Sequence, residues 1–137
     1  MNNKIQQLRD EIVSNCNLNE FADTLYKILN LIYASDCLIS CCDIYHVSSI
    51  EQSIDNSKKS HIRISLKHEK SIHIIWDILH EFGHHLSGNP NGNEKTLERE
   101  NKAWDIAHDY LKSFSDLVKY KTDFHEYRTK NIETYLK

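Results

Sequence analysis

Glycine and proline are scarce in this sequence, with three glycines and one proline among its 137 residues. Because both residues are poor helix formers and are common in flexible segments, their scarcity argues against a long disordered tail and for a helix-rich chain. Charged residues make up 27% and hydrophobic residues 39%, as in ordinary globular domains. A chain of this length typically forms one domain around one buried core, so we expect a single domain over residues 1–137.

Long apolar runs and a secretory signal are also missing. No stretch approaches the length of a transmembrane helix, and the N-terminal segment MNNKIQQLRDEIVSN contains no apolar core of a signal peptide. The net charge of −3 provides no basic surface for nucleic acid. The cysteines form no C-x-x-C pair, which favours buried reduced thiols at Cys16, Cys37, Cys41 and Cys42. We therefore expect a cytoplasmic protein that binds neither membranes nor nucleic acids; its oligomeric state stays open.

Apolar residues at helical spacing, together with capping residues, indicate how many helices the chain contains. They predict five helices, at about residues 4–16, 18–34, 71–87, 97–119 and 124–135. Short polar side chains precede four of them and are expected to cap their N-termini: Asn17, Ser71, Thr96 and Asp123. The segment GNPNGN at 88–93 ends the third helix, because it holds two of the three glycines and the only proline.

Two segments rich in β-forming residues lie between the second and third helices. DCLISCCDIYHVSSI lacks helical periodicity and predicts one or two strands between residues 37 and 50. HIRISLK alternates strictly, which predicts a strand with Ile62, Ile64 and Leu66 on one face, and the polar segment EQSIDNSKKS between them predicts a loop. The expected fold is α+β, with a small antiparallel or mixed sheet packed with about five helices.

The segment HEFGHH, residues 80–85, contains the pattern H-E-x-x-H. On a helix, His80 and His84 are one turn apart, so both imidazoles project the same way and can bind one metal ion. Glu81 lies slightly further round, where a general base for a zinc-bound water belongs. His73 and Asp77 share this polar face, opposite the apolar stripe. The position of the motif therefore favours a metal site over a chance match.

A catalytic zinc needs a third protein ligand, and the next helix offers candidates. A third histidine of the form H-E-x-x-H-x-x-G-x-x-H is excluded, because Pro90 stands at its position. Glu100 is followed by Ala103 and Ala107 on the same helical face, and small residues allow two helices to approach closely. We therefore predict Glu100 as the third ligand; the alternatives are Glu98, Asp105, His108 or no third ligand.

HEFGHH followed by ERENKAWDIA resembles the ImmA/IrrE family of gluzincin metallopeptidases, over about 30 residues from Ile78 to Ala107. The family pattern is H-E-x-G-H and then a glutamate with alanines three and seven residues later. The resemblance implies a zincin-like fold with His80, His84 and Glu100 as zinc ligands and Glu81 as the base. The family often has asparagine and phenylalanine where this chain has Trp104 and Ile106, and its LLMP-like segment is replaced by HDYLKSF.

The resemblance implies a zinc-dependent peptidase acting on a protein or peptide substrate, such as a cytosolic repressor, or a toxin-like protease. We expect the substrate to add to the edge of the HIRISLK strand. An oxyanion donor is also expected, and its candidates are His85, His108 and Tyr110. Asp77 could orient a ligand imidazole. Two rival interpretations are a catalytically silent zincin-fold regulatory protein that binds metal, and a helical interaction module with an accidental motif.

Overall fold

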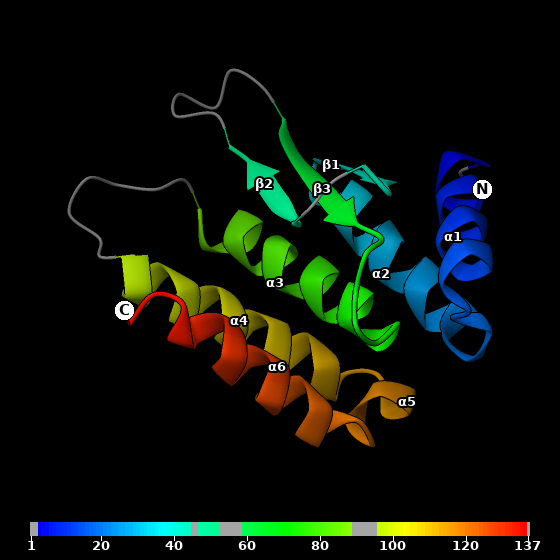
Figure 1. Ribbon diagram of the computed structural model, residues 1–137. Coiled ribbons are helices and arrows are strands. Elements are labelled where there is room, and N and C mark those ends of the chain that lie inside the picture. The colour runs from blue at the N-terminus through cyan, green and yellow to red at the C-terminus, as the bar shows by residue number, and fades with distance from the viewer. Residues whose placement is uncertain (1–2, 45–46, 53–58, 89–95, 137) are drawn as a thin grey trace.

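The computed structural model describes residues 3–44, 47–52, 59–88 and 96–136 (Figure 1). Over these residues the fold is α+β, with six α-helices, one short 3₁₀ helix and a three-stranded mixed sheet. In chain order the elements are α1 (Asn3–Cys16), η1 (Asn19–Phe21), α2 (Ala22–Ala34), β1 (Cys37–Cys42), β2 (Ser49–Glu51), β3 (Ser60–Ser65), α3 (Ile72–Ser87), α4 (Thr96–Lys112), α5 (Ser115–Val118) and α6 (Lys121–Glu133).

The predicted HIRISLK strand is β3, and it is the central strand of the sheet. The strand order is β1-β3-β2, with β3 parallel to β1 and antiparallel to β2. Ile62 and Ile64 are fully buried, as the alternation predicts, but Ser65 is fully buried too. Because both neighbours of β3 are strands, the expected addition of a substrate to this strand is wrong: the outer strands are β1 and β2.

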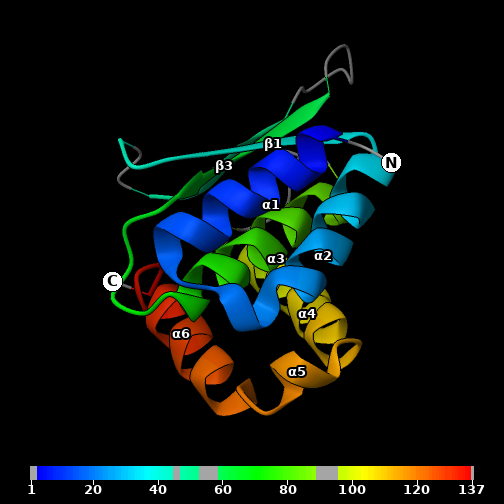
Figure 2. The same cartoon turned by 90° about the vertical axis from the view of Figure 1, so that its right-hand side faces the viewer.

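Helix α3 lies in the middle of the molecule, between the sheet on one side and α4 and α6 on the other (Figures 1 and 2). Helices α1 and α2 lie next to one another beside it. This position explains why most of the α3 side chains are buried, including Trp76, Ile78 and Phe82 on different faces of the helix. No helix of the described chain is long and apolar enough to cross a membrane.

The helix predicted over 97–119 is interrupted, which adds a sixth helix. Helix α4 ends at Lys112, and Phe114 adopts an extended conformation with φ −120° and ψ 107° before α5 begins. The turn lets Leu117 enter the core and lets the Thr24 hydroxyl donate a hydrogen bond of 2.5 Å to Asp116. The sequence around Phe114 has no proline or glycine and would allow the helix to continue. The contacts of Leu117 with the core and of Asp116 with Thr24 instead favour a turn at this point.

Three of the predicted side-chain caps are not formed. Asn17 has a positive φ of 55° just after α1, and Ser71 makes no capping hydrogen bond to α3. Asp123 lies inside α6, where its carboxylate accepts hydrogen bonds from the Trp76 indole at 2.9 Å and the Lys70 ammonium at 2.8 Å. Thr96 is the first described residue of helix α4. Residues 89–93 of the predicted turn and 53–58 of the predicted loop lie outside the described residues.

Candidate metal centre

His80, His84 and Glu100 converge between α3 and α4. The Nε2 atom of His80 lies 3.0 Å from Oε1 of Glu100, and the Nε2 atom of His84 lies 2.7 Å from Oε2 of the same carboxylate. One ligand atom from each residue lies within 4.8 Å of the others, so the group could hold a metal ion. The structure therefore brings together the three residues that the sequence predicts as ligands.

Close packing of two helices places Glu100 opposite the two histidines. A Cβ atom added to Gly83 would overlap the backbone oxygen of Ala103 and would lie 2.9 Å from its carbonyl carbon. Ala103 and Ala107 are fully buried in this contact. Only a glycine facing an alanine allows the helices to come this near. The predicted alanine face of α4 is thus confirmed, and Gly83 is its counterpart on α3.

Trp104 supports the site from behind His80. Its indole stacks nearly flat on the imidazole, with ring centroids 4.1 Å apart and planes 8° apart, and Trp104 is fully buried. The stack limits the rotation of the His80 ring and keeps Nε2 aimed at Glu100. The sequence showed this tryptophan one turn after Glu100, but a buried tryptophan on a helix is most often a core residue, so its contact with His80 was not predicted.

The protonation states of His80 and Glu100 suit metal binding. Burial lowers the pKa of His80, which favours the neutral imidazole that coordinates metals. For Glu100, burial acts to raise the pKa, but the hydrogen bonds with His80 and His84 outweigh it and hold the pKa well below its usual range. Near neutral pH, His80 therefore favours its neutral, metal-binding form and Glu100 is an ionised carboxylate.

Glu81 is a second buried carboxyl group next to this set. Its side chain faces the same cavity as Glu100 and is 5% exposed, and its Oε1 atom lies 3.9 Å from Nδ1 of His80. Burial first, and then the charges of Asp77 and Glu100, raise the pKa of Glu81 to about 8. A carboxyl group with this pKa can both release and accept a proton close to neutral pH.

Asp77 contacts α6 rather than a ligand imidazole. The Tyr127 hydroxyl donates to its Oδ1 atom at 2.6 Å, and His68 Nε2 lies 3.1 Å from Oδ2 at an angle that makes no hydrogen bond. In the described part of the chain, no hydrogen bond joins Asp77 to His80. The prediction that Asp77 orients a ligand histidine is therefore not met; it fixes Tyr127, whose pKa is raised first by burial and then by the charge of Asp77.

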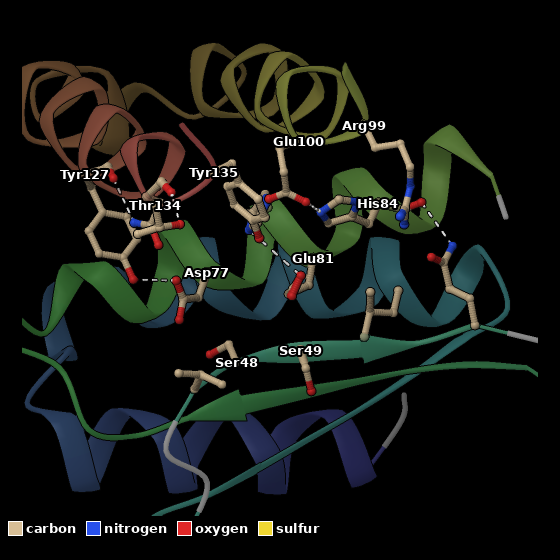
Figure 3. A pocket seen from close by; sticks show the side chains of 15 residues that line it. Ser48, Ser49, Asp77, Glu81, His84, Arg99, Glu100, Tyr127, Thr134 and Tyr135 are labelled. Atoms are coloured by element: carbon tan, nitrogen blue, oxygen red, sulfur yellow. Dashed lines mark hydrogen bonds and ion pairs between the residues drawn. The ribbon is translucent and has the colours of Figure 1, made fainter. Parts of the chain in front are cut away.

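An open cavity of about 670 Å³ gives access to the site (Figure 3). Its walls come from the polar face of α3, the first turns of α4, the end of α6 with the turn after it, and β2 with its flanking residues. The lining residues are Val47, Ser48, Ser49, Ile50, Gln52, Asp77, His80, Glu81, His84, Arg99, Glu100, Tyr127, Asn131, Thr134 and Tyr135. The polar face of α3, which the sequence assigns to the metal site, is buried against this cavity.

None of the three predicted oxyanion donors lines the cavity. His85 Nε2 lies 2.9 Å from the backbone oxygen of Ser35, on the side of α3 that faces α2. Tyr110 packs against Phe82, with ring centroids 5.4 Å apart, and His108 stacks on the ring of Phe124. Each of these side chains has a packing or hydrogen-bonding role elsewhere in the fold.

The alternative metal ligands also lie away from the site. Glu98 is exposed on α4, two residues before Glu100 and therefore on the opposite side of the helix. Asp105 forms an ion pair of 2.8 Å with Arg128 on the outside of the helix pair. Among the described residues, His80, His84 and Glu100 form the only group of three or more side chains that could hold a metal ion.

Comparisons of this chain with protein-family models, with curated proteins and with solved structures find no match.

Proposed function

We propose that the chain is a zinc-dependent peptidase with a zincin-like fold, of the ImmA/IrrE type, that hydrolyses peptide bonds of a protein substrate. The observation that carries the proposal is the convergence of His80, His84 and Glu100 in a cavity beside the buried carboxyl group of Glu81. Such a set is expensive to bury without a ligand, since it places several ionisable groups together away from water.

The donor set fits zinc better than the common alternatives. Two imidazole nitrogens and one carboxylate are the ligands of one class of catalytic zinc sites, which keep a further position open. Calcium and magnesium prefer oxygen ligands and are disfavoured by the two histidines. When bound, zinc polarises a carbonyl group and lowers the pKa of water.

Glu81 is the proposed general base and acid. Its position in the cavity, next to His80, would allow it to take a proton from the attacking water and deliver it to the leaving amine. Trp104 restrains the imidazole of His80 by stacking on the face of the ring, and Glu100 restrains it through the contact with Nε2. Pre-ordering of this kind reduces the rearrangement that the reaction needs.

An extended substrate is proposed to bind along β2 instead of β3. Ser48, Ser49 and Ile50 line the cavity, and within the described chain β2 pairs on one side only, with β3. Gln52 fixes the end of this strand to α3 through hydrogen bonds of 3.2 Å to the backbone oxygens of His84 and Gly88. Main-chain hydrogen bonds to an edge strand hold a peptide extended across a site.

Tyr135 is the proposed donor to the carbonyl oxygen of the scissile bond. It lies in the turn after α6, lines the cavity and is 46% exposed, so a substrate can reach it. Burial, then the charge of Glu100 and a hydrogen bond to Glu100, raise its pKa, which keeps the phenol protonated. To serve a substrate carbonyl, the phenol would exchange its hydrogen bond to Glu100 for one to the substrate. Tyr127, the other phenol of the cavity, already donates to Asp77.

The experiment compares the wild type with Glu81→Gln, both loaded with zinc, in a cell lysate whose new peptide termini are identified by mass spectrometry. Loss of a positioned general base is expected to slow cleavage by about 10² to 10⁴. Zinc content and melting temperature are expected to stay the same, because the ligands and the packed face of α3 are unchanged. Equal cleavage by both proteins would contradict the proposal. Bound zinc without any cleavage would favour the catalytically silent metal-binding protein.

A further inference from the structure

The cavity wall contains a cationic side chain that the proposed chemistry does not use. Arg99 is the only arginine or lysine among the described residues that line the cavity. It is half-buried, and its position in the first turn of α4 is next to the ligand Glu100. Figure 3 shows its side chain extending from α4 toward α3, at the end of the cavity where His84 lies.

The guanidinium of Arg99 has no counter-ion in the part of the chain that the structure describes. The three other arginines each form an ion pair with a carboxylate: Arg9 with Asp10 at 2.9 Å, Arg63 with Glu51 at 2.8 Å and Arg128 with Asp105 at 2.8 Å. The adjacent Glu100 is not a substitute, because its two oxygens face His80 and His84. A half-buried guanidinium at the wall of an open cavity, without a counter-ion in the described residues, is therefore available to bind an anionic group that enters.

Charge is distributed unevenly along the cavity. Asp77 lies at one end with Tyr127, and Arg99 lies at the other end, with Glu81 and Glu100 between them (Figure 3). An acidic group that enters the Asp77 end meets a carboxylate, whereas at the Arg99 end it meets a guanidinium. A peptide lying across the site thus experiences opposite charges on the two sides of the reacting bond.

We propose that Arg99 is a carboxylate-binding site, so that the substrate has an acidic group on the side of the scissile bond that lies at the Arg99 end of the cavity. The planar guanidinium presents paired N–H donors that match a carboxylate in a two-pronged contact. The carboxylate belongs to an aspartate or glutamate side chain, or to the C-terminus of a short peptide. The inference rests on the proposed peptidase function and names the class of peptide that it takes.

Binding can be measured without cleavage in the zinc-loaded Glu81→Gln protein. The probes are pools of N-acetylated hexapeptides. In each pool one position is fixed as glutamate or as glutamine and the other positions vary. Each pool is made once with a free C-terminus and once with an amidated C-terminus. Peptides retained on the immobilised protein are counted by mass spectrometry. The same measurement is made after a further substitution: Arg99→Gln, Arg99→Lys, or Arg9→Gln as the control for loss of a positive charge on α1, away from the cavity.

Glutamate is expected to be retained over glutamine by about tenfold at one position, the size of a hydrogen-bonded charge pair. Arg99→Gln is expected to abolish this preference, Arg99→Lys to reduce it, and Arg9→Gln to leave it intact, with zinc content equal in all four proteins. A preference for the free over the amidated C-terminus, lost in Arg99→Gln, supports the same site with a terminal carboxylate. Peptide binding without charge preference, a preference that survives Arg99→Gln, or no retention of any pool overturns the proposal.

Incubation of the same pools with the wild-type enzyme separates this inference from the proposed function. Selective retention by the Glu81→Gln protein, with no Glu81-dependent cleavage by the wild type, supports the Arg99 site and contradicts the peptidase. Glu81-dependent cleavage with no preference for acidic peptides supports the peptidase and contradicts the Arg99 site.

Discussion

The substitution Gly83→Ala tests how the structure positions its metal ligands. Gly83 lies between His80 and His84 on α3, and an added Cβ would meet the backbone of Ala103 on α4. Glu100 is one turn away from Ala103 on the same helix. The structure therefore predicts that one methyl group on α3 affects both the stability of the fold and the position of Glu100.

Two effects of opposite sign determine the change in stability. Replacing glycine by alanine inside a helix stabilises it by about 1 kcal/mol. Overpacking costs about 1 to 3 kcal/mol, and the upper figure applies here because the atom that must yield belongs to a backbone and not to a flexible side chain. The difference between about 3 and about 1 leaves Gly83→Ala destabilised by about 2 kcal/mol, although helix propensity alone predicts stabilisation.

The expected loss of metal affinity follows from the same contact. The carbonyl carbon of Ala103 would have to move from 2.9 Å to an ordinary contact at 3.4 Å, a shift of at least about 0.5 Å. Metal–ligand distances tolerate about 0.2 Å, so the shift displaces Glu100 from coordination. We expect the zinc affinity to fall by at least about tenfold.

Urea unfolding and competition with a chromogenic chelator measure the two quantities. The control is Gly88→Ala: Gly88 has a φ of 93° and no atom within 4 Å of an added Cβ. With a ψ of 178°, Gly88 lies in a backbone region that is essentially restricted to glycine, so strain alone should cost this variant about 1 to 3 kcal/mol and leave zinc affinity unchanged. A Gly83→Ala protein as stable as the wild type, with equal zinc affinity, would refute the argument that the close approach of α3 and α4 positions Glu100.

Three further outcomes can be measured on the purified protein. Loss of a residue that only hydrogen-bonds a metal ligand costs roughly 10- to 100-fold in metal affinity, so Glu100→Gln, which alters a ligand itself, should lower zinc affinity by more than that. Glu98→Gln should leave zinc affinity unchanged. Chelator competition measures both. Removal of zinc by a chelator should lower the melting temperature of the wild type more than that of Glu100→Gln, because the ion stabilises only the folded state that binds it. Burial acts to raise the pKa of Asp123, but the hydrogen bonds from Lys70 and Trp76 lower it by more. The pKa of Asp123 in the folded protein is therefore below 3.8. Asp123→Asn should therefore cost about 1 kcal/mol above pH 4, and the difference should disappear as the pH falls through the lowered pKa; a pH-independent difference in urea unfolding would contradict this.

The helices and the ligand set could be predicted because they depend on local spacing. Two histidines one turn apart share a helical face, and the alanines after Glu100 mark the face that approaches another helix. Both features persist wherever the helices are placed in the fold. The structure accordingly brings together His80, His84 and Glu100, and places the alternative Glu98 in solvent.

The rest of the site depends on contacts between distant segments. The order of the strands decides that β2 and not β3 lies beside the cavity, and alternation within a strand contains no information about its neighbours. Helix α6 supplies Tyr127 and the turn with Tyr135, yet Phe124 is its only buried side chain. Because α6 has few apolar residues at helical spacing, its sequence did not predict that its C-terminal end would line the cavity.

The ionisable side chains on the polar face of α3 are buried, and this burial supports the proposed function. The spacing of apolar residues in the sequence does not predict it. Periodicity separates two faces of a helix but does not determine whether the polar face meets water or protein. Here Asp77, Glu81 and His84 are at most 7% exposed, because α4 and α6 pack over this face. Buried ionisable groups reduce stability unless they are paired, and the raised pKa of Glu81 reflects this cost. A fold selected only for stability would place apolar residues there, so the burial of these groups around an open cavity supports the proposed chemistry independently of the motif.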